Sequence, residues 1–347
     1  MERLRIGWVG AGFVGQVAHL ANYVELPNAE VVALAERRPE LGKKVCTKWG
    51  IPRLYSDHHA LLRDPDVDAV VAVVRREHTA SVALDVLKGR KHLFTEKPMA
   101  ATLEQASRLV EAANGLRYAV GFMRRHDEGA QIGKRLLDEL RASEELGPVI
   151  YARFYCFAGY DWCNIGGAVA TEEPRPDELF LPLAPDWIDP ALHREFDWFN
   201  NVYSHDLNFI RYIFGQRPTV EHVHYRKPTI SVATLAFDGF PGVFEFGPMD
   251  QYRWEEGVDV YFQRGRLRIE LPPAMLRNVP SRVELYKDKG SGQREVVSPQ
   301  AEWTWAFRRQ AEAFVDDVRL GREPLASGAD SLEDMRFLED FWRRIVS

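Results

Sequence analysis

The sequence predicts an α/β protein in two parts, an N-terminal doubly wound parallel sheet followed by an α+β domain whose sheet is mostly antiparallel. From residue 4 to about residue 120, short β-rich runs alternate with segments of helical period, as repeated βαβ units require. Beyond residue 122 the strand-like runs are grouped together, with helix-like segments before and after them. We therefore expect one domain over residues 1–121 and a second over residues 122–347.

The first part contains five strand-like runs, at residues 5–9, 31–35, 69–74, 92–95 and 118–121. Segments of helical period lie between them, including residues 13–26, 79–88 and 103–113. The third run, AVVAVV, is apolar at every position, which is typical of a central strand covered on both faces. These patterns predict a parallel sheet with helices on both sides.

The second part begins with a helix-like stretch at residues 129–140 and a strand at residues 151–157. A helix is expected at residues 199–214, two more close the chain at 303–320 and 331–346, and the strands between them are expected at 229–238, 242–247, 258–263, 266–271 and 282–287. Two of these strands carry apolar side chains on both faces, which favours burial of the open face in a homo-oligomer.

Residues 158–197 look like an irregular insert, with five prolines and nine acidic residues against two arginines. Loops of this length in a compact domain are usually functional, so we expect the insert to determine the substrate, a solvated acidic face being the alternative. Its Trp162 could stack on a sugar ring or pack within the loop.

Composition narrows the classes of function. The chain has 45 lysines and arginines against 51 aspartates and glutamates, a net charge of −6, which disfavours binding to nucleic acid. Its three cysteines, none in a CxxC pair, indicate neither a disulfide scaffold nor a thiolate zinc site, and no metal is expected. No apolar run approaches the length of a membrane span, and the N-terminus resembles no signal peptide, so we expect a cytoplasmic protein without a membrane partner.

A glycine-rich motif joins the first predicted strand to the first helix. Gly10, Gly12 and Gly15 form G-A-G-F-V-G, in which glycines allow a tight turn and close approach of the backbone. The N–H groups at the start of the helix then bind a pyrophosphate. We expect a dinucleotide to bind here, with its pyrophosphate over Gly12, Phe13 and Val14.

Glu36 closes the next strand, 21 residues after Gly15. A carboxylate at this place accepts hydrogen bonds from the adenosine ribose and disfavours a 2′-phosphate, which predicts NAD as the cofactor. Arg37 and Arg38 follow directly, and either could pair with a 2′-phosphate, so NADP stays possible. An ordinary solvated loop is the alternative for all three side chains.

The fifth run ends in HLFTEKPMA, which places Lys97 at the carboxyl end of a parallel strand, where open α/β sheets bind ligands. Together with GAGFVG, SDHHALLRDPDVDAV and DSLEDMRFLEDFW, this E-K-P tripeptide resembles the Gfo/Idh/MocA oxidoreductase family. The resemblance implies a Rossmann half, a C-terminal domain with a large open sheet, and a homodimer or homotetramer. It also implies that Glu96 and Lys97 border the cofactor.

The third motif of that family, D-x-x-x-H, corresponds to the stretch WFNNVYSHDLNFIRYIFG. His205 takes the histidine position, whereas Asn201 stands where aspartate is usual and Asn208 where a further aspartate often lies. An amide can orient a hydroxyl group or an imidazole, but it cannot act as a base. We expect Asn201 and Tyr203 to contact substrate, although packing is the alternative for Tyr203.

A second departure follows the AVVAVV strand, where Val74, Arg75 and Arg76 replace the family's T-P-N loop. The two guanidinium groups could hold an anionic group, Arg75 on the substrate and Arg76 at the cofactor. A solvated loop is the alternative.

The resemblance and the residue types together predict an NAD(P)-dependent oxidoreductase that moves hydride between nicotinamide and a secondary alcohol or ketone of a sugar, cyclitol or derivative. Lys97 and His205 are the expected catalytic residues: an ammonium stabilises a developing alkoxide, and a neutral imidazole accepts a proton. Two alternatives use the same cofactor. One is a glycosidase that oxidises C3 transiently, and the other is a cofactor-sensing regulatory protein that needs neither side chain.

Overall fold

Residues 3–174 and 184–347 are described by the computed structural model, so residues 175–183 of the predicted insert lie outside the described part of the chain. The chain divides into two compact units. The first contains Met1–Phe122, Gly166–Asn201 and Phe307–Arg336, and the second contains Met123–Ile165, Val202–Ala306 and Phe337–Ser347. Much of the insert thus belongs to the same unit as the glycine motif. The boundary between residues 121 and 122 stays a prediction.

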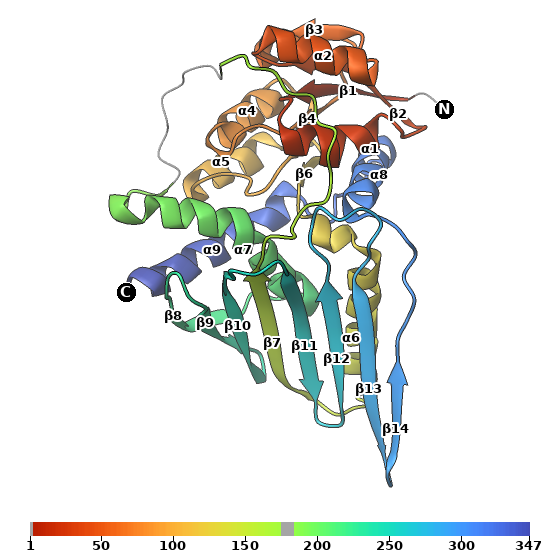
Figure 1. Cartoon of the computed structure of the whole chain (residues 1–347), viewed down its shortest axis with the longest axis vertical. Coiled ribbons are helices and arrows are strands. Elements are labelled where there is room, and N and C mark those ends of the chain that lie inside the picture. Colours follow the sequence, from red (N-terminus) through yellow and green to blue (C-terminus); the bar gives the residue numbers. More distant parts are fainter. Residues whose placement is uncertain (1–2, 175–183) are drawn as a thin grey trace. The chain divides into compact units, whose positions relative to one another are not determined.

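The first unit is built on a parallel sheet of six strands in the order β3-β2-β1-β4-β5-β6 (Figure 1). The strands are β1 (Leu4–Val9), β2 (Ala29–Ala35), β3 (Arg53–Tyr55), β4 (Ala69–Ala72), β5 (His92–Thr95) and β6 (Tyr118–Val120). The order reverses between β1 and β4, and ligands of such sheets bind at the carboxyl ends of the strands beside this point. The predicted doubly wound sheet is confirmed.

Helices cover both faces of this sheet. A helical stretch with one π turn, η1 (Gly15–Leu20), runs directly into α1 (Ala21–Tyr23) after the glycine motif. This unit also contains α2 (Pro39–Trp49), α3 (His58–Leu62), α4 (Arg76–Lys88), α5 (Leu103–Ala112), the beginning of α7 (His193–Phe214), most of α8 (Ala306–Leu320) and the first turns of α9 (Gly328–Val346). One apolar cluster joins the sheet to α3, α4 and α5, and a second joins it to α1, α2 and α8.

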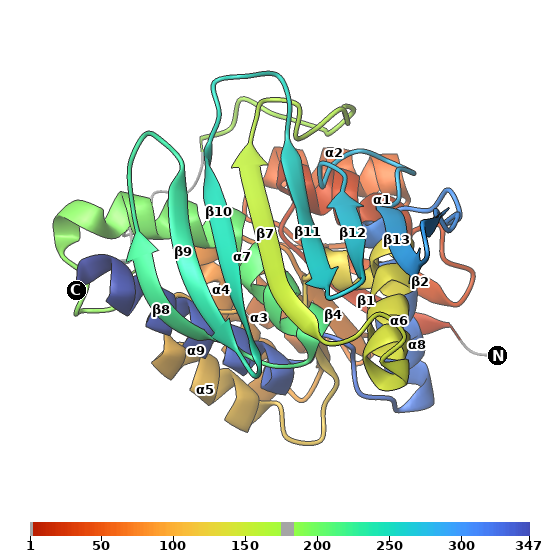
Figure 2. The same ribbon diagram turned by 90° about the horizontal axis from the view of Figure 1, so that it is seen from below.

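The second unit contains an eight-stranded sheet in the order β14-β13-β12-β11-β7-β10-β9-β8, seen face-on in Figure 2. Its strands are β7 (Val149–Ala158), β8 (Thr219–His224), β9 (Ser231–Phe237), β10 (Phe240–Pro248), β11 (Glu255–Phe262), β12 (Gly265–Leu271), β13 (Arg282–Gly290) and β14 (Gln293–Val297). All neighbours pair antiparallel except β7 and β10, which are parallel. The expected large, mostly antiparallel sheet is confirmed.

The two faces of this sheet differ in chemistry. One face packs against helices, with α6 (Glu128–Ser143) over β12 and β13, and with aromatic contacts from α7 (His193–Phe214) and α9 to β10. The opposite face carries the half-buried rings of Tyr151 and Tyr155 and an ion-pair network of Arg153, Asp259 and Arg268. Two short 3₁₀ turns, η2 (Met123–His126) and η3 (Pro190–Leu192), precede α6 and α7.

None of the helices in the described ranges combines the length and apolarity that a membrane span needs. Cys46, Cys156 and Cys163 are free thiols.

Candidate active site

The glycine motif forms the turn at the carboxyl end of β1. Gly10 has a φ of +91°, and a Cβ there would lie 2.4 Å from the carbonyl oxygen of Val73, so only glycine fits. Gly12 is different, because a Cβ built on it meets no protein atom within 4 Å. The loop thus leaves open space over Gly12 just before a helix begins, which fits a pyrophosphate bound to backbone N–H groups.

Substitutions at Gly10 and Gly12 should have different effects, the first on stability and the second on cofactor binding. We expect Gly12→Val to leave the melting temperature within about 2 °C of the wild-type value, because the side chain enters open space. The same substitution should weaken NAD(H) binding about 10-fold or more, since the side chain takes the room of the pyrophosphate. Gly10→Ala should instead lower the melting temperature by several degrees. Thermal melts and calorimetric titrations check both, and wild-type affinity in Gly12→Val would remove the dinucleotide from this loop.

Glu36 lies at the end of β2 and reaches the same turn. Its carboxylate is 7% exposed and accepts a hydrogen bond of 2.8 Å from the backbone N–H of Ala11. Arg38 donates to both carboxylate oxygens, through Nε at 2.8 Å and through a terminal nitrogen at 3.1 Å. Arg37 has an exposed side chain. The structure therefore joins Glu36 to the glycine motif and adds Arg38 as its ion-pair partner.

Glu96 is tied to the first helix through a residue that the sequence patterns did not single out. His19 Nε2 lies 2.6 Å from Glu96 Oε1, and the backbone N–H of Lys97 donates to Glu96 Oε2 at 3.0 Å. The imidazole is 1% exposed and packs between the rings of Phe94 and Phe307. Glu96 thus fixes the loop after β5 to the helix that follows the glycine motif. No local pattern marks His19, because its partner lies 77 residues further along the chain.

Lys97 follows Glu96 and points to the middle of α7. Its ammonium donates to the backbone carbonyl of Asn201 at 2.5 Å, and Oδ1 of the same asparagine lies 3.5 Å away. The side chains of Asn201 and His205 stand one helical turn apart on α7, so they share a face of that helix. The structure therefore brings Lys97 and Asn201 together, while their roles toward cofactor and substrate stay predictions.

The two arginines after β4 both have carboxylate partners. Arg76 forms a two-point ion pair with Asp197 on α7, one bond being 2.9 Å long. Arg75 is more exposed and pairs with Glu77. Asp197 lies one turn before Asn201, and the sequence patterns did not identify it as a site residue. The predicted roles of Arg75 and Arg76 toward substrate and cofactor stay predictions.

In the second unit, Tyr203 is buried on α7, with 1% of its side chain exposed. Its ring contacts Phe244 and Phe246 edge-on, at centroid distances of 6.1 and 5.0 Å. Burial raises the pKa of this phenol far above its ordinary value, which makes Tyr203 a poor acid. His205 is half-buried. Trp162, in the same unit, is 46% exposed, and its role toward substrate stays a prediction.

A buried acid lies beside His205. Burial, together with the nearby charge of Glu256, raises the pKa of Asp206 well above its ordinary value, while Arg124 and the Cys156 thiol act against that shift. Arg124 is itself paired with Glu256 in the interior. Because a buried carboxylate without full compensation is costly, the surroundings of Asp206 favour its neutral, protonated form.

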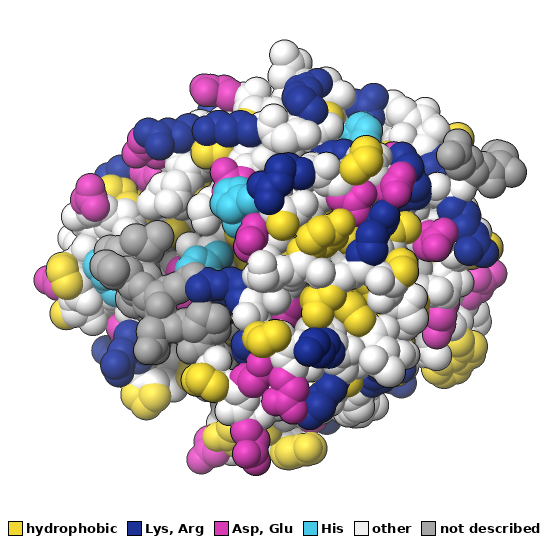
Figure 3. All heavy atoms as spheres, turned by 90° about the horizontal axis from the view of Figure 1, so that it is seen from above, with side chains coloured by type: hydrophobic (Ala, Val, Ile, Leu, Met, Phe, Trp, Pro, Cys, Tyr) yellow, Lys and Arg dark blue, Asp and Glu magenta, His cyan; other side chains and the backbone are white. Residues whose placement is uncertain are grey.

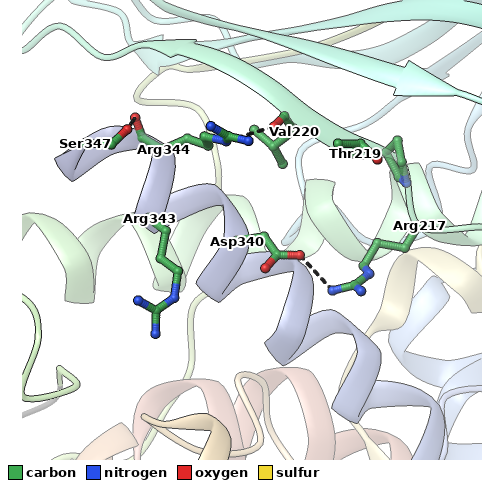
Figure 4. Close-up of a pocket in the computed structure, with 8 residues that line it drawn as sticks. Arg217, Thr219, Val220, Asp340, Arg343, Arg344 and Ser347 are labelled. Carbon is green, nitrogen blue, oxygen red and sulfur yellow. Dashed lines mark hydrogen bonds and ion pairs between the residues drawn. The ribbon is translucent and has the colours of Figure 1, made fainter.

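Two other features involve none of the site residues named so far. A hollow of about 420 Å³ in the second unit is lined by β8 and the end of α9 (Figure 4). Its Arg217 pairs with Asp340, and Arg344 donates to the carbonyl of Val220. In the first unit, His58 Nε2 lies 3.0 Å from Asp85 Oδ2 with His59 nearby, a group whose spacing suits a metal but whose carboxylate already accepts a hydrogen bond. Figure 3 shows one face of the molecule, on which acidic and basic side chains are intermixed.

Residues 4–122 match the family described as "Oxidoreductase family, NAD-binding Rossmann fold", abbreviated GFO_IDH_MocA. An inositol 2-dehydrogenase of Acidothermus cellulolyticus is 39% identical over 324 residues, which cover 92% of this chain and 86% of that protein. The chain belongs to this family. A myo-inositol 2-dehydrogenase of Thermotoga maritima is 23% identical over 94% of this chain and 92% of its own length.

Solved structures of two dehydrogenases share the fold. A levoglucosan dehydrogenase in complex with NADH and levoglucosan superposes with a TM-score of 0.77 at 15% identity, covering 99% of this chain and 98% of that one. A myo-inositol dehydrogenase from Lactobacillus casei, in complex with NAD(H) and myo-inositol, gives a TM-score of 0.72 at 21% identity, covering 99% and 95%. The present protein is an NAD(P)-dependent oxidoreductase with the Rossmann fold of that family.

This oxidoreductase departs from the family motif at two places on α7, as the sequence indicates. Asn201 takes the place of the usual aspartate and leaves a neutral amide beside Lys97. Asn208 is buried in the second unit and accepts a hydrogen bond of 2.9 Å from Nε of Arg125. Each of the two amide oxygens therefore lies near a cation, Asn201 near Lys97 and Asn208 near Arg125. Neither amide supplies the negative charge that an aspartate would.

Proposed function

We propose that this oxidoreductase interconverts a secondary alcohol and a ketone on a polyhydroxylated ring, a cyclitol or a sugar, with NAD as cofactor. The observation that carries the proposal is the position of the Lys97 ammonium. It lies at the carboxyl end of a parallel strand, its neighbour Glu96 is bonded to the helix after the glycine motif, and it donates to Asn201. The inositol 2-dehydrogenases among its relatives support the class of substrate.

The cofactor, when bound, supplies a nicotinamide ring that accepts or donates hydride. The protein must then move the hydroxyl proton and stabilise charge on the oxygen. Lys97 provides a positive charge for that oxygen. His205 is the proposed proton acceptor, since imidazole is the side chain that most readily exchanges a proton near neutral pH. Asn201, which contacts Lys97 and precedes His205 by one turn, is the proposed contact for a substrate hydroxyl group.

The proposal is tested by incubating the purified protein with NAD⁺ and a panel of inositols, aldoses and anhydrosugars while following the absorbance of NADH. Accumulation of NADH with at least one cyclitol or sugar is the expected result. A glycosidase that uses NAD transiently would instead cleave an aryl glycoside without net formation of NADH. A regulatory protein would bind cofactor and turn over none of these compounds.

A homodimer or homotetramer in the cytoplasm is part of the same proposal. The open sheet face, with Tyr151 and Tyr261 in contact at a centroid distance of 5.8 Å, is the proposed contact surface between copies. Light scattering at micromolar concentration should give a dimer or larger mass, and a monomer would contradict this part of the proposal.

A further inference from the structure

A carboxylate of the insert, that of Glu173, binds the start of α2 in the first unit. Glu173 accepts hydrogen bonds from the backbone N–H groups of Glu40 at 2.9 Å and Leu41 at 2.7 Å, and the hydroxyl of Thr171 donates to it at 3.1 Å. Both amides belong to the first turn of α2, whose N-terminal residue is Pro39. The first amides of a helix attract anions, and here a side chain from 132 residues away occupies them.

The segment that carries Glu173 is anchored close to the glycine motif. The backbone N–H of Val169 donates to Oε1 of Gln16 at 2.8 Å, and Nε2 of Gln16 donates to the carbonyl of Val169 at 2.9 Å. Nε2 of Gln16 also donates to the carbonyl of Ala11 in the glycine motif. Gln16 is 1% exposed and Val169 is half-buried. The ammonium of Lys48 on α2 donates to the carbonyl of Gly167. Residues 167–173 are thus held between the first helix and α2.

Arg38 connects this carboxylate with the ribose residue Glu36. It donates to both oxygens of Glu36, and its positive charge also acts on Glu173, where it helps to hold the pKa of that carboxyl below its ordinary value. Burial opposes the lowering, and the bonds from the N-terminal amides of α2 and from Thr171 outweigh it. Arg38, which is paired with Glu36, also directly precedes the first residue of α2, so the Glu36–Arg38 pair and the Glu173 carboxylate both lie at the N-terminus of that helix.

We propose that Glu173 selects NAD over NADP by filling the anion position at the start of α2, next to the ion pair of Glu36 and Arg38. A 2′-phosphate carries close to two negative charges at neutral pH and needs free N–H donors or an uncompensated cation. It finds two carboxylates in their place. The 2′-hydroxyl of NAD carries no charge and needs only a hydrogen-bond acceptor, which the carboxylate of Glu36 provides. This inference rests on the proposed cofactor site and goes beyond it, because the selecting residue lies outside the sheet and its loops.

The test compares the dissociation constants of NAD⁺ and NADP⁺ by calorimetry on the full chain, for wild type, Glu173→Ala and Glu173→Gln. Glu172→Gln is the matched control, because it removes the same charge from the neighbouring, exposed position. We expect Glu173→Ala to lower the ratio of the NADP⁺ to the NAD⁺ constant about 10-fold or more, through tighter NADP⁺ binding. NAD⁺ affinity should change less than about 3-fold, and Glu172→Gln should leave the ratio unchanged.

Glu173→Gln retains one oxygen that can accept from an α2 amide, so it keeps the test valid if the alanine variant folds poorly. It should shift the ratio in the same direction. A ratio that stays at the wild-type value in both variants would overturn the proposal, as would an equal loss of affinity for both cofactors, which a purely structural cap would give. A wild type that binds NADP⁺ as well as NAD⁺ also overturns it while leaving the proposed oxidoreductase function intact. Failure to bind either cofactor would instead count against the dinucleotide site itself.

Discussion

Lys97→Ala should lower kcat by about 100-fold or more while the dissociation constant for NAD(H) changes only a few-fold. The ammonium lies at the carboxyl end of β5 and reaches the carbonyl of Asn201, so its removal takes away the positive charge proposed for the reacting oxygen. The glycine motif and Glu36 do not depend on this side chain, because their hydrogen bonds involve Ala11 and Arg38. Steady-state kinetics and a cofactor titration measure the two effects separately.

Lys91→Ala is the matched control for this substitution. Its ammonium also donates to a backbone carbonyl at 2.5 Å, that of Val67, but it lies before β5 rather than after it. The control should lose some stability and keep its turnover. Should Lys97→Ala retain most of the wild-type kcat, the E-K-P lysine would have a structural role in this enzyme.

The second large effect concerns the pH dependence of kcat/KM. Asn201→Asp places a carboxylate one helical turn before His205, and an opposite charge at such a distance favours the protonated imidazole. We therefore expect the pH midpoint of the basic group to move upward, by no more than about two units for a partly solvated pair. Activity should be lost at the lower pH values, where the imidazole now holds its proton and can no longer accept one.

The structure places a second cation beside the same position, because Lys97 lies 3.5 Å from Asn201 Oδ1. The new carboxylate would therefore also favour the charged form of the lysine. His205→Asn, alone and combined with Asn201→Asp, distinguishes the two groups. We expect His205→Asn alone to remove the titration from the pH profile of kcat/KM and to abolish most of the activity. A midpoint that still moves with Asn201→Asp when His205 is absent would assign the titration to Lys97 and exclude His205 as the base.

The sequence was informative wherever a pattern was local. The six-residue apolar run before Arg75 predicted the central strand, and G-A-G-F-V-G predicted a turn that the φ of Gly10 and the space over Gly12 bear out in detail. The fold class followed from these periodicities. Three short or half-exposed strands were not recognised, namely β3, β8 and β14, because three to six residues with polar side chains carry too little hydrophobic period.

The starting residues of two helices were also predicted wrongly. α7 begins at His193, six residues before the predicted start, and the polar side chains and flanking prolines of that stretch resemble a loop. The predicted helix at 303–320 begins instead at Ala306, and Trp303 is exposed.

Those residues of the candidate site that belong to a local sequence motif could be predicted. Glu36, Glu96 and Lys97 stand in local patterns, and the structure gives each a definite partner. The distant partners could not be predicted, since Asp197 and Glu173 reach Arg76 and α2 only through long-range placement, whereas the local pairing of Arg38 with Glu36 joins two residues that the sequence had already placed together. Charge in the insert looked like a property of the whole segment. In the structure, one of its carboxylates caps a helix and another pairs with Arg76.

Net hydride transfer to the cofactor is the central claim, and an isotope measurement tests it most directly. The best substrate of the panel is prepared with deuterium on the carbon that carries the reacting hydroxyl group and is incubated with NAD⁺ and the protein. Mass spectrometry should find one deuterium in the NADH formed, in equal amount to the ketone product. Ketone-free cleavage of a glycosidic bond, or turnover in which no deuterium reaches the released cofactor, would contradict the assignment as a dehydrogenase.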